Sequence, residues 1–293
     1  MTTSSPMKGR TCLVTGASGG IGKETAVGLA KLGATVVMVS RDSERGEAAL
    51  SDVRLRSGGS GDVHLMLADL ASLQAVRSLA SEFRQRHQQL HVLVNNAGAY
   101  NAKRLLSEDG HELTFAVNHL AHFLLTNLLL DLLKASAPSR IVNVSSRSHM
   151  GATIDFDDLH NERGYRGMSV YGQSKLANVL FTRELARRLE GTGVTANSLH
   201  PGLVKTGFGR NNGGAIGAIF RMFQARIFQF VPIPFIITPE QGAETSIYLA
   251  SSPDVESVTG KYFVKKEPVP SSESSSDPAL AARLWQVSEE LAS

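Results

Sequence analysis

The sequence predicts an α/β fold with a single doubly wound parallel sheet, helices on both faces, an apolar lid insertion and a C-terminal helix. Two observations support this fold class. Apolar, β-branched runs alternate with helical patterns along the chain, and a glycine-rich turn from Thr15 to Gly22 directly follows the first run. Repeated strand–helix units give a parallel sheet, because right-handed crossovers return each strand beside an earlier one.

The individual elements follow from the two periodicities of strands and helices. Short apolar, β-branched runs predict strands at 12–15, 35–40, 63–68, 91–95, 140–145 and 194–199, with a late edge strand near 261–264. Helical patterns lie at 21–32, 44–56, 73–87, 112–134, 170–189, 239–250 and 279–291. No internal repeat or linker divides the chain, so we expect a single domain.

Composition excludes several classes of protein. With 293 residues, 42% of them hydrophobic, the chain can bury one large core. The net charge of +3 is not gathered in a dense basic run, so we expect no nucleic-acid partner. The single cysteine, Cys12, excludes an internal disulfide, is expected to be buried, and fits a cytoplasmic protein. No apolar run reaches the roughly 18 residues of a membrane span.

Three glycines, Gly16, Gly20 and Gly22, stand between the first strand and the first helix. Glycine permits a tight turn and lets the backbone approach a pyrophosphate, which the N–H groups at a helix N-terminus attract. Glycines at such a junction could also be purely structural. Their place directly after the first strand favours a dinucleotide site on a Rossmann-type sheet.

Tyr171 and Lys175 are four residues apart in a helical pattern, so both side chains can point into one site. A cation beside a phenol favours the phenolate, so we expect Lys175 to lower the pKa of Tyr171. That pair suits proton transfer to or from an alcohol oxygen. The pair alone is a weak signal, since it could equally lie on a solvated helix face.

Taken together, these motifs resemble the short-chain dehydrogenase/reductase family over about residues 8–265. The resemblance rests on the turn from Thr15 to Gly22, Asn95-Asn96-Ala97-Gly98, Ser146, Tyr171-x-x-x-Lys175 and Pro201-Gly202, in that order. The strings GIGKETA, RIVNVSS, YGQSKLANVLF, HPGLVKT and LWQVSEEL are similar to the retinol dehydrogenase branch of that family.

The resemblance implies four catalytic residues: Asn118, Ser146, Tyr171 and Lys175. Tyr171 would be the general acid and base, with Lys175 holding the nicotinamide ribose and stabilising tyrosinate. Ser146 would hydrogen-bond the substrate oxygen. Ser145 is an alternative, but alternating strand faces let only one of the two serines point into the site. Asn118 would support a water relay behind the lysine, although by itself it could be a satisfied polar residue within a helix.

The resemblance also implies a set of residues that bind the nicotinamide dinucleotide. They are Gly16, Ser18, Gly19, Gly20, Ile21, Gly22, Ser40, Arg41, Asp69, Leu70, Asn96, Ala97, Gly98, Tyr171, Lys175, Pro201, Gly202, Val204 and Thr206. Arg41 and Asp42 both stand where a ribose 2′-group is recognised. Relatives read the phosphate with the first residue after the strand, so we expect NADP(H) rather than NAD(H). Arg41 could instead be a surface charge. No metal is expected, because His119 and His122 lack further ligands.

The chain divides into three regions under this interpretation. Residues 1–8 would be a disordered terminus, 9–265 the catalytic domain with a lid at about 205–237, and 266–293 a tether and a helix packed on the domain. The predicted helices 112–134 and 170–189 could also form a homo-oligomer interface, as they do in similar enzymes.

The lid would choose the substrate. Half of the 12 phenylalanines lie between residues 208 and 237, which favours a lipophilic alcohol, aldehyde or ketone. The lid could instead pack on its own body or a partner subunit, or touch a membrane surface. The function expected is an NADP(H)-dependent oxidoreductase. The alternatives are a dinucleotide-binding redox sensor without turnover and a sugar-nucleotide epimerase.

Overall fold

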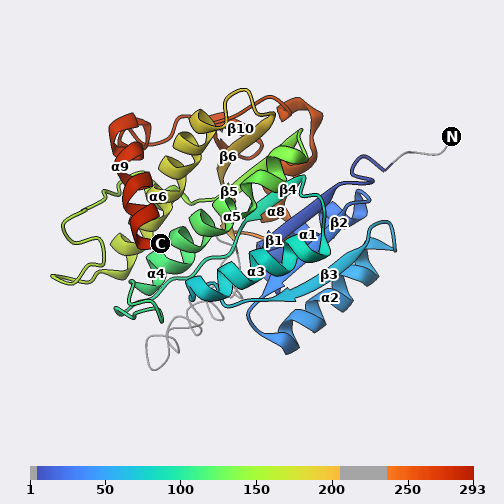
Figure 1. Cartoon of the computed structure of the whole chain (residues 1–293), viewed down its shortest axis with the longest axis horizontal. Coiled ribbons are helices and arrows are strands. Elements are labelled where there is room, and N and C mark those ends of the chain that lie inside the picture. Colours follow the sequence, from blue (N-terminus) through green and yellow to red (C-terminus); the bar gives the residue numbers. More distant parts are fainter. Residues whose placement is uncertain (1–4, 205–235) are drawn as a thin grey trace.

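The central sheet confirms the predicted α/β fold. The computed structural model describes residues 5–204 and 236–293. Its sheet runs in the order β3-β2-β1-β4-β5-β6-β9-β10 (Figure 1), and every neighbouring pair is parallel except β9 with β10. The strands are β1 (Thr11–Thr15), β2 (Thr35–Ser40), β3 (Val63–Leu67), β4 (Val92–Asn95), β5 (Ser139–Val144), β6 (Val194–His200), β9 (Tyr262–Val264) and β10 (Glu267–Val269). Strand order reverses between β1 and β4, and sheets of this kind bind ligands beyond the carboxyl ends of the strands there.

Two helical layers cover the sheet. One contains α1 (Gly20–Lys31), α2 (Ser43–Ser57) and α8 (Pro239–Ser251), and the other α3 (Leu73–Arg86), α5 (Ala121–Ala135) and α6 (Gly167–Arg188). Successive side chains of β1 point to opposite faces of the sheet. Leu13 belongs to the core under α3, α5 and α6, whereas Val14 belongs to the core under α1, α2 and α8.

The predicted helix at 112–134 is built in three pieces. A short turn α4 (Leu113–Phe115) leads into a π-helical turn (Ala116–Leu120) and then into α5. By length and composition Leu113–Ala135 could cross a membrane, but 72% of its most apolar window is buried inside the protein. It is therefore a core helix of this domain, and its π-helical turn is of the kind often found at functional sites.

Two predictions about the ends of the domain are wrong. Met7, expected in a disordered terminus, is 5% exposed, and its N–H donates to the Leu32 carbonyl at 2.9 Å. The expected tether from 266 is folded: Glu267–Val269 forms the edge strand β10, and Ser274–Ser276 forms a 3₁₀ turn. The strand forms because Glu267, Pro268 and Val269 pair with β9.

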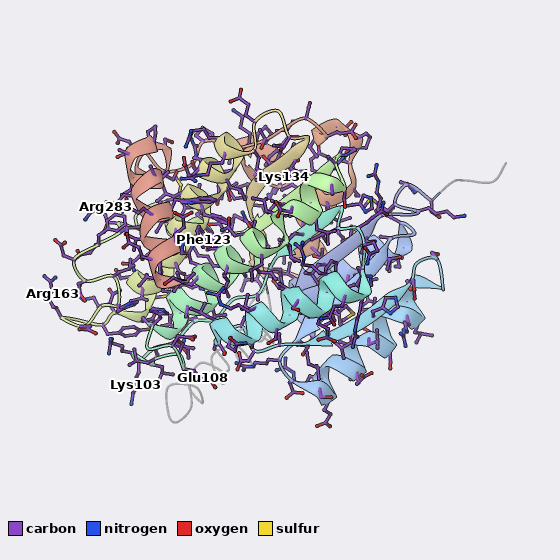
Figure 2. The ribbon with its side chains drawn as sticks, in the orientation of Figure 1. Lys103, Glu108, Phe123, Lys134, Arg163 and Arg283 are labelled. Atoms are coloured by element: carbon purple, nitrogen blue, oxygen red, sulfur yellow. The ribbon has the colours of Figure 1, made fainter. Side chains whose placement is uncertain are left out.

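The last helix, α9 (Pro278–Leu291), lies along α6 (Figure 1). Its Trp285 ring lies 5.0 Å from that of Phe123 and 5.8 Å from that of Phe181, centre to centre. The Arg188 guanidinium lies over the Trp285 indole, with its Cζ 4.1 Å from the ring centre. Arg283, labelled on the same helix in Figure 2, lies over the Phe156 ring, 4.2 Å from its centre. Aromatic packing thus fastens the C-terminus to the body.

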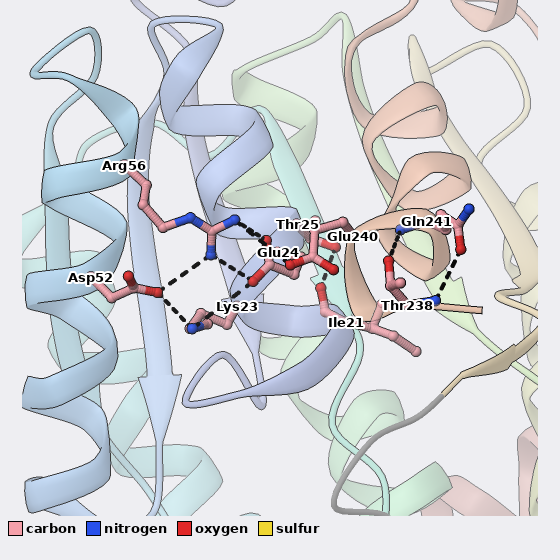
Figure 3. A network of polar contacts seen from close by, with 9 residues as sticks. All are labelled: Ile21, Lys23, Glu24, Thr25, Asp52, Arg56, Thr238, Glu240 and Gln241. Carbon is pink, nitrogen blue, oxygen red and sulfur yellow. Dashed lines mark hydrogen bonds and ion pairs between the residues drawn. The ribbon is translucent and has the colours of Figure 1, made fainter. Parts of the chain in front are cut away.

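A polar network joins α1, α2 and α8 (Figure 3). Glu24, only 6% exposed, accepts both terminal nitrogens of Arg56 at 2.7 and 2.6 Å. The hydrogen bonds to Glu24 raise the pKa of Arg56 above its usual value. Arg56 also lies 4.0 Å from Glu240 of α8, and Lys23 donates to Asp52 at 2.6 Å. This network fixes the position of α1, and the first turn of α1 contains Gly20 and Gly22.

Replacing Trp285 by alanine should destabilise the domain strongly. The indole is 5% exposed, so its loss leaves a cavity between Phe123 and Phe181. We expect the free energy of unfolding, measured by urea denaturation, to fall by about 3–5 kcal/mol. Gln286→Ala, on the exposed side of α9, is the control and should change it by less than about 0.5 kcal/mol. Equal effects of both variants would contradict the packing role.

Candidate active site

A cavity of about 690 Å³ lies at the carboxyl ends of the central strands. It brings together most of the residues predicted from the sequence: Gly16, Ser18, Gly19, Gly20, Ile21, Gly22, Ser40, Arg41, Asp69, Leu70, Asn96, Ala97, Gly98, Tyr171, Lys175 and Pro201. Residues that directly follow β1 and β4 thus meet residues of β2 and α6 in one space, as the switch in strand order predicts.

Other predicted residues lie elsewhere. Val204 faces α8, where it would stand 2.6 Å from a Cβ placed on Gly242. Gly202, with φ at +95°, turns the chain after β6 beside Ile237. Neither residue lines the cavity. Thr206 and the lid, apart from the short strand Ile236–Ile237, lie outside the described residues.

The glycine turn is shaped by close backbone approach. Gly16 has a φ of +66°, and a Cβ there would lie 2.8 Å from the Ala97 Cα. A Cβ on Gly22 would lie 2.4 Å from both the Gly16 oxygen and the Asn96 amide nitrogen. Within the described part of the chain, the N-cap residue Gly19 gives α1 no side-chain cap, so its first N–H groups are open to a ligand. The turn therefore fits a pyrophosphate of a dinucleotide.

Thr15 and Asn96 tie this turn to the end of β4. Thr15 Oγ1 accepts hydrogen bonds from the N–H groups of Asn96 at 2.9 Å and Ala97 at 3.0 Å. In return, the Asn96 amide donates to the Thr15 carbonyl at 2.8 Å. Asn96 lines the cavity, but its amide nitrogen is engaged by the turn, so its main effect is on the shape of the site.

Asn95 is a core residue and does not line the cavity. It is fully buried, and its amide donates to Asn143 at 2.8 Å and to Thr126 at 3.0 Å. These bonds connect β4 with β5 and α5.

Tyr171 and Lys175 lie one turn apart on α6. The Lys175 Nζ is 5.6 Å from the centre of the Tyr171 ring, and it donates to the Val144 carbonyl at 3.0 Å. The Tyr100 ring meets that of Tyr171 edge-on at 6.3 Å. Both α6 side chains line the cavity, so the pair does not lie on a solvated helix face.

The prediction that Lys175 lowers the pKa of Tyr171 is wrong for this structure. Burial raises the pKa of Tyr171 to about 12, and the hydrogen bond that opposes this shift comes from Ser146. Burial also lowers the pKa of Lys175 to about 8. Near neutral pH the phenol is therefore protonated, which is the form that can give a proton to a carbonyl oxygen.

The two serines after β5 have different partners. Ser145 lines the cavity, but its hydroxyl donates to the main-chain oxygen of Lys175 at 2.7 Å. Ser146 contacts Tyr171 and donates to Ser148 Oγ at 3.2 Å. Ser146 does not line the cavity as it stands, yet its hydroxyl is the one beside the phenol.

Asn118 lies in the π-helical turn and is fully buried. Its Oδ1 accepts from the Ala99 N–H at 2.7 Å, and its Nδ2 donates to the Ala99 carbonyl at 3.0 Å and to Ser174 Oγ at 2.9 Å. Asn118 thus connects the segment after β4 to α6 at Ser174, the residue that precedes Lys175.

The far end of the cavity contains two arginines. Asp42 caps α2 by accepting from the Arg45 N–H at 2.8 Å, and its main-chain oxygen accepts from Ser40 at 2.8 Å. Arg41 and Arg45 line the cavity, and Arg45 Nη2 would lie 3.9 Å from a Cβ on Gly19. Asp42 does not line the cavity, whereas both arginines do.

Sequence reasoning missed part of the lining: Val39, Arg45, Ala68, Ala71, Ala99, Tyr100, Leu113, Val117 and Val144. Arg45 stands four residues after Arg41, and that helical spacing could have identified it. Within residues 5–204 and 236–293, no three His, Cys, Asp or Glu side chains are grouped so that they could hold a metal ion.

Comparisons with known proteins agree with this site. A family model described as short chain dehydrogenase matches residues 10–215. The chain belongs to this family, and it is an oxidoreductase that acts on CH–OH groups with a nicotinamide dinucleotide.

More particular similarities are to retinol dehydrogenases. Human retinol dehydrogenase 14 is 47% identical, covering 97% of this chain and 86% of its own length, and human retinol dehydrogenase 13 is 45% identical, covering 97% and 84%. Among solved structures, a protein of Mycobacterium paratuberculosis matches with a TM-score of 0.76 at 33% identity, covering 97% of this chain and 94% of its own. A structure described as an NAD(P)-dependent gluconate 5-dehydrogenase of Beutenbergia cavernae, with bound NADP, matches with a TM-score of 0.68 at 29% identity, covering 89% and 97%.

A methyl group on Gly22 should damage the dinucleotide site. In Gly22→Ala the new Cβ would meet the Gly16 carbonyl and the Asn96 amide at 2.4 Å, so the turn must open. Since overpacking of this kind costs roughly 1–3 kcal/mol, we expect dinucleotide affinity, measured by fluorescence titration, to fall about tenfold. Gly164→Ala is the control, because a Cβ there meets nothing within 4 Å. Unchanged affinity in Gly22→Ala would show that the turn does not hold the ligand.

Proposed function

We propose that the protein is an NADP(H)-dependent oxidoreductase that interconverts a lipophilic alcohol and its carbonyl compound, with Tyr171 as general acid and base. One observation carries this proposal: Tyr171 and Lys175 share a cavity with an uncapped, glycine-shaped helix start. A phenol that can exchange a proton and a cradle for a dinucleotide are the two requirements of this chemistry.

The residues in and around the cavity would divide the work as follows. Nicotinamide, when bound, supplies or accepts the hydride. Tyr171 gives its proton to the carbonyl oxygen in reduction and removes it in oxidation. Ser146, which contacts the phenol, would hydrogen-bond the same substrate oxygen. Lys175 places its ammonium behind Tyr171, and Asn118 holds the backbone at Ala99 and α6 in register. The raised pKa of Tyr171 keeps the phenol protonated near neutral pH, which is the form that donates to a carbonyl oxygen.

The preference for NADP(H) is supported by charge. Arg41 and Arg45 both line the far end of the cavity, whereas Asp42, the acidic residue between them, caps α2 with its carboxylate. A guanidinium matches the geometry of a phosphate, and a charged hydrogen bond of this type contributes about 1.5–3 kcal/mol. The absence of Asp42 from the cavity lining supports the same preference.

Arg41→Ala should weaken the use of NADPH selectively. The loss of one charged contact to the 2′-phosphate predicts a fall of about ten- to hundredfold in kcat/KM for NADPH. The value for NADH should change by less than about threefold, because NADH lacks that phosphate. Arg86→Ala, which removes an exposed arginine paired with Glu82 on α3, is the matched control. Comparable wild-type efficiencies with both dinucleotides would refute the preference.

A lipophilic substrate is favoured by relatives and by the described wall of the cavity. The similar human proteins are named retinol dehydrogenases. Tyr100, Leu113 and Val117 add an apolar side next to Tyr171. We therefore propose retinoids or other long-chain, lipophilic aldehydes and ketones as the substrate class. Contact of the lid with a membrane, a homo-oligomer and a cytoplasmic location stay predictions.

Tyr171→Phe should abolish most turnover while leaving NADPH bound. General acid–base catalysis contributes about 10²–10⁴-fold, so kcat for retinaldehyde and related aldehydes should fall by at least about a hundredfold. NADPH consumption is followed by absorbance and binding by fluorescence. Tyr248→Phe, a partly buried tyrosine on α8, is the control. Near-normal turnover in Tyr171→Phe would remove the residue from its role, and saturable binding of NADPH without turnover by the wild type would favour the sensor instead.

A further inference from the structure

A buried histidine connects the active-site serine to the C-terminal segment, defined here as residues 267–291. His149 is fully buried, three residues after Ser146. Its Nδ1 lies 2.7 Å from the Ser146 carbonyl oxygen, and its Nε2 lies 3.3 Å from the backbone nitrogen of Ser272. A backbone N–H can only donate, so Nε2 must accept and Nδ1 must carry the proton. One neutral tautomer therefore satisfies both contacts.

The surroundings of His149 hold it in that form. Burial lowers its pKa, which favours the neutral ring. The Tyr262 ring packs edge-on against it at 4.6 Å. The segment around Ser272, which His149 contacts, is held in place as well. Arg183 donates to Ser271 Oγ at 2.9 Å, and Ser275 Oγ donates to the Ser272 carbonyl at 2.6 Å. Through His149, the C-terminal segment thus holds the Ser146 backbone in place.

A second buried histidine makes an equivalent connection to Asn118. His119 is the next residue in the π-helical turn, and its Nε2 lies 2.8 Å from Ser288 Oγ on α9. That hydroxyl donates to the Leu284 carbonyl at 2.7 Å, so it must accept from His119, which therefore carries its proton on Nε2. Burial lowers the pKa of His119 to about 4. The two histidines hold opposite tautomers, each fixed by a serine of the C-terminal segment.

We propose that the C-terminal segment positions Ser146 and Asn118 for catalysis through the pairs His149–Ser272 and His119–Ser288, an inference that rests on the proposed function. Neither histidine lines the cavity, so each acts through its neighbour and touches no reacting group. Ordinary packing would explain buried histidines. It does not explain why both tautomers are set by the same C-terminal segment, next to two different active-site residues.

Positioning predicts an effect on kcat without an effect on binding. A displacement of about 1 Å from productive geometry can cost a hundredfold in rate. In His149→Asn the shorter amide can still donate to the Ser146 carbonyl but cannot reach Ser272. In Ser288→Ala the acceptor for His119 is removed. For both variants we expect kcat for aldehyde reduction to fall about ten- to hundredfold, with KM and the NADPH Kd within about threefold of wild type.

Matched variants separate positioning from general loss of stability. Glu273→Ala and Gln286→Ala change exposed side chains of the same segment and should leave kcat unchanged. His149→Gln keeps an acceptor that can reach Ser272 but loses the contact to Ser146, so it should lower kcat as well. Thermal unfolding of every variant identifies those that are folded at the assay temperature.

The tautomers give a readout that does not depend on turnover. In ¹⁵N-histidine spectra of the wild type, we expect His149 to carry its proton on Nδ1 and His119 on Nε2. Ser288→Ala should change the signal of His119, and faster amide exchange should follow at residues 116–120. The same tautomer on both rings, or unchanged exchange in Ser288→Ala, would overturn the proposal even if the enzyme were inactive on every aldehyde tried.

If the wild type turns over and the folded variants His149→Asn and Ser288→Ala keep its kcat, the proposal is also overturned. Absence of turnover in the wild type, by contrast, would count against the proposed function, and the spectra would then decide on the coupling alone.

Discussion

A reciprocal pair of hydrogen bonds between β5 and α6 sets the geometry of the whole site. The Lys175 ammonium donates to the Val144 carbonyl at 3.0 Å, and the Ser145 hydroxyl donates to the main-chain oxygen of Lys175 at 2.7 Å. A buried cation is costly without partners, so the end of the strand must remain under this turn of the helix. That constraint places Tyr171 over the cavity and Ser146 beside it.

Behind this pair, hydrogen bonds between buried amides and hydroxyls connect the sheet to α6. Asn95 donates to Asn143, Asn143 donates to Thr182, and Thr182 donates to the Asn178 carbonyl, in a chain from β4 through β5 into α6. On the α5 side, Asn118 plays the same part for the segment after β4. Polar groups of this kind specify one arrangement of the core, since each must find its own partner. The active site is therefore built on a core with little freedom to shift.

The sequence predicted what local pattern determines. Strand and helix periodicity located the sheet, the glycine turn and the face shared by Tyr171 and Lys175. What it could not predict depends on packing between distant segments. The pKa of Tyr171 rises because other elements bury it, and Arg45 matters because α2 starts beside the glycine turn. Glu267–Val269 forms a strand only because β9 is there to pair with it. The partners of His119 and His149 lie more than a hundred residues away along the chain.

The place of Trp285 also has a consequence for biosynthesis. Phe123 and Phe181 stay uncovered until α9 arrives, and α9 is made after everything that it covers. Domains emerging from the ribosome fold from their N-terminal end, and uncovered aromatic surface invites association with other nascent chains. The β1–β3 half can form early, but the half that carries the tyrosine helix must wait for its cover. That surface is therefore open to such association until α9 is in place.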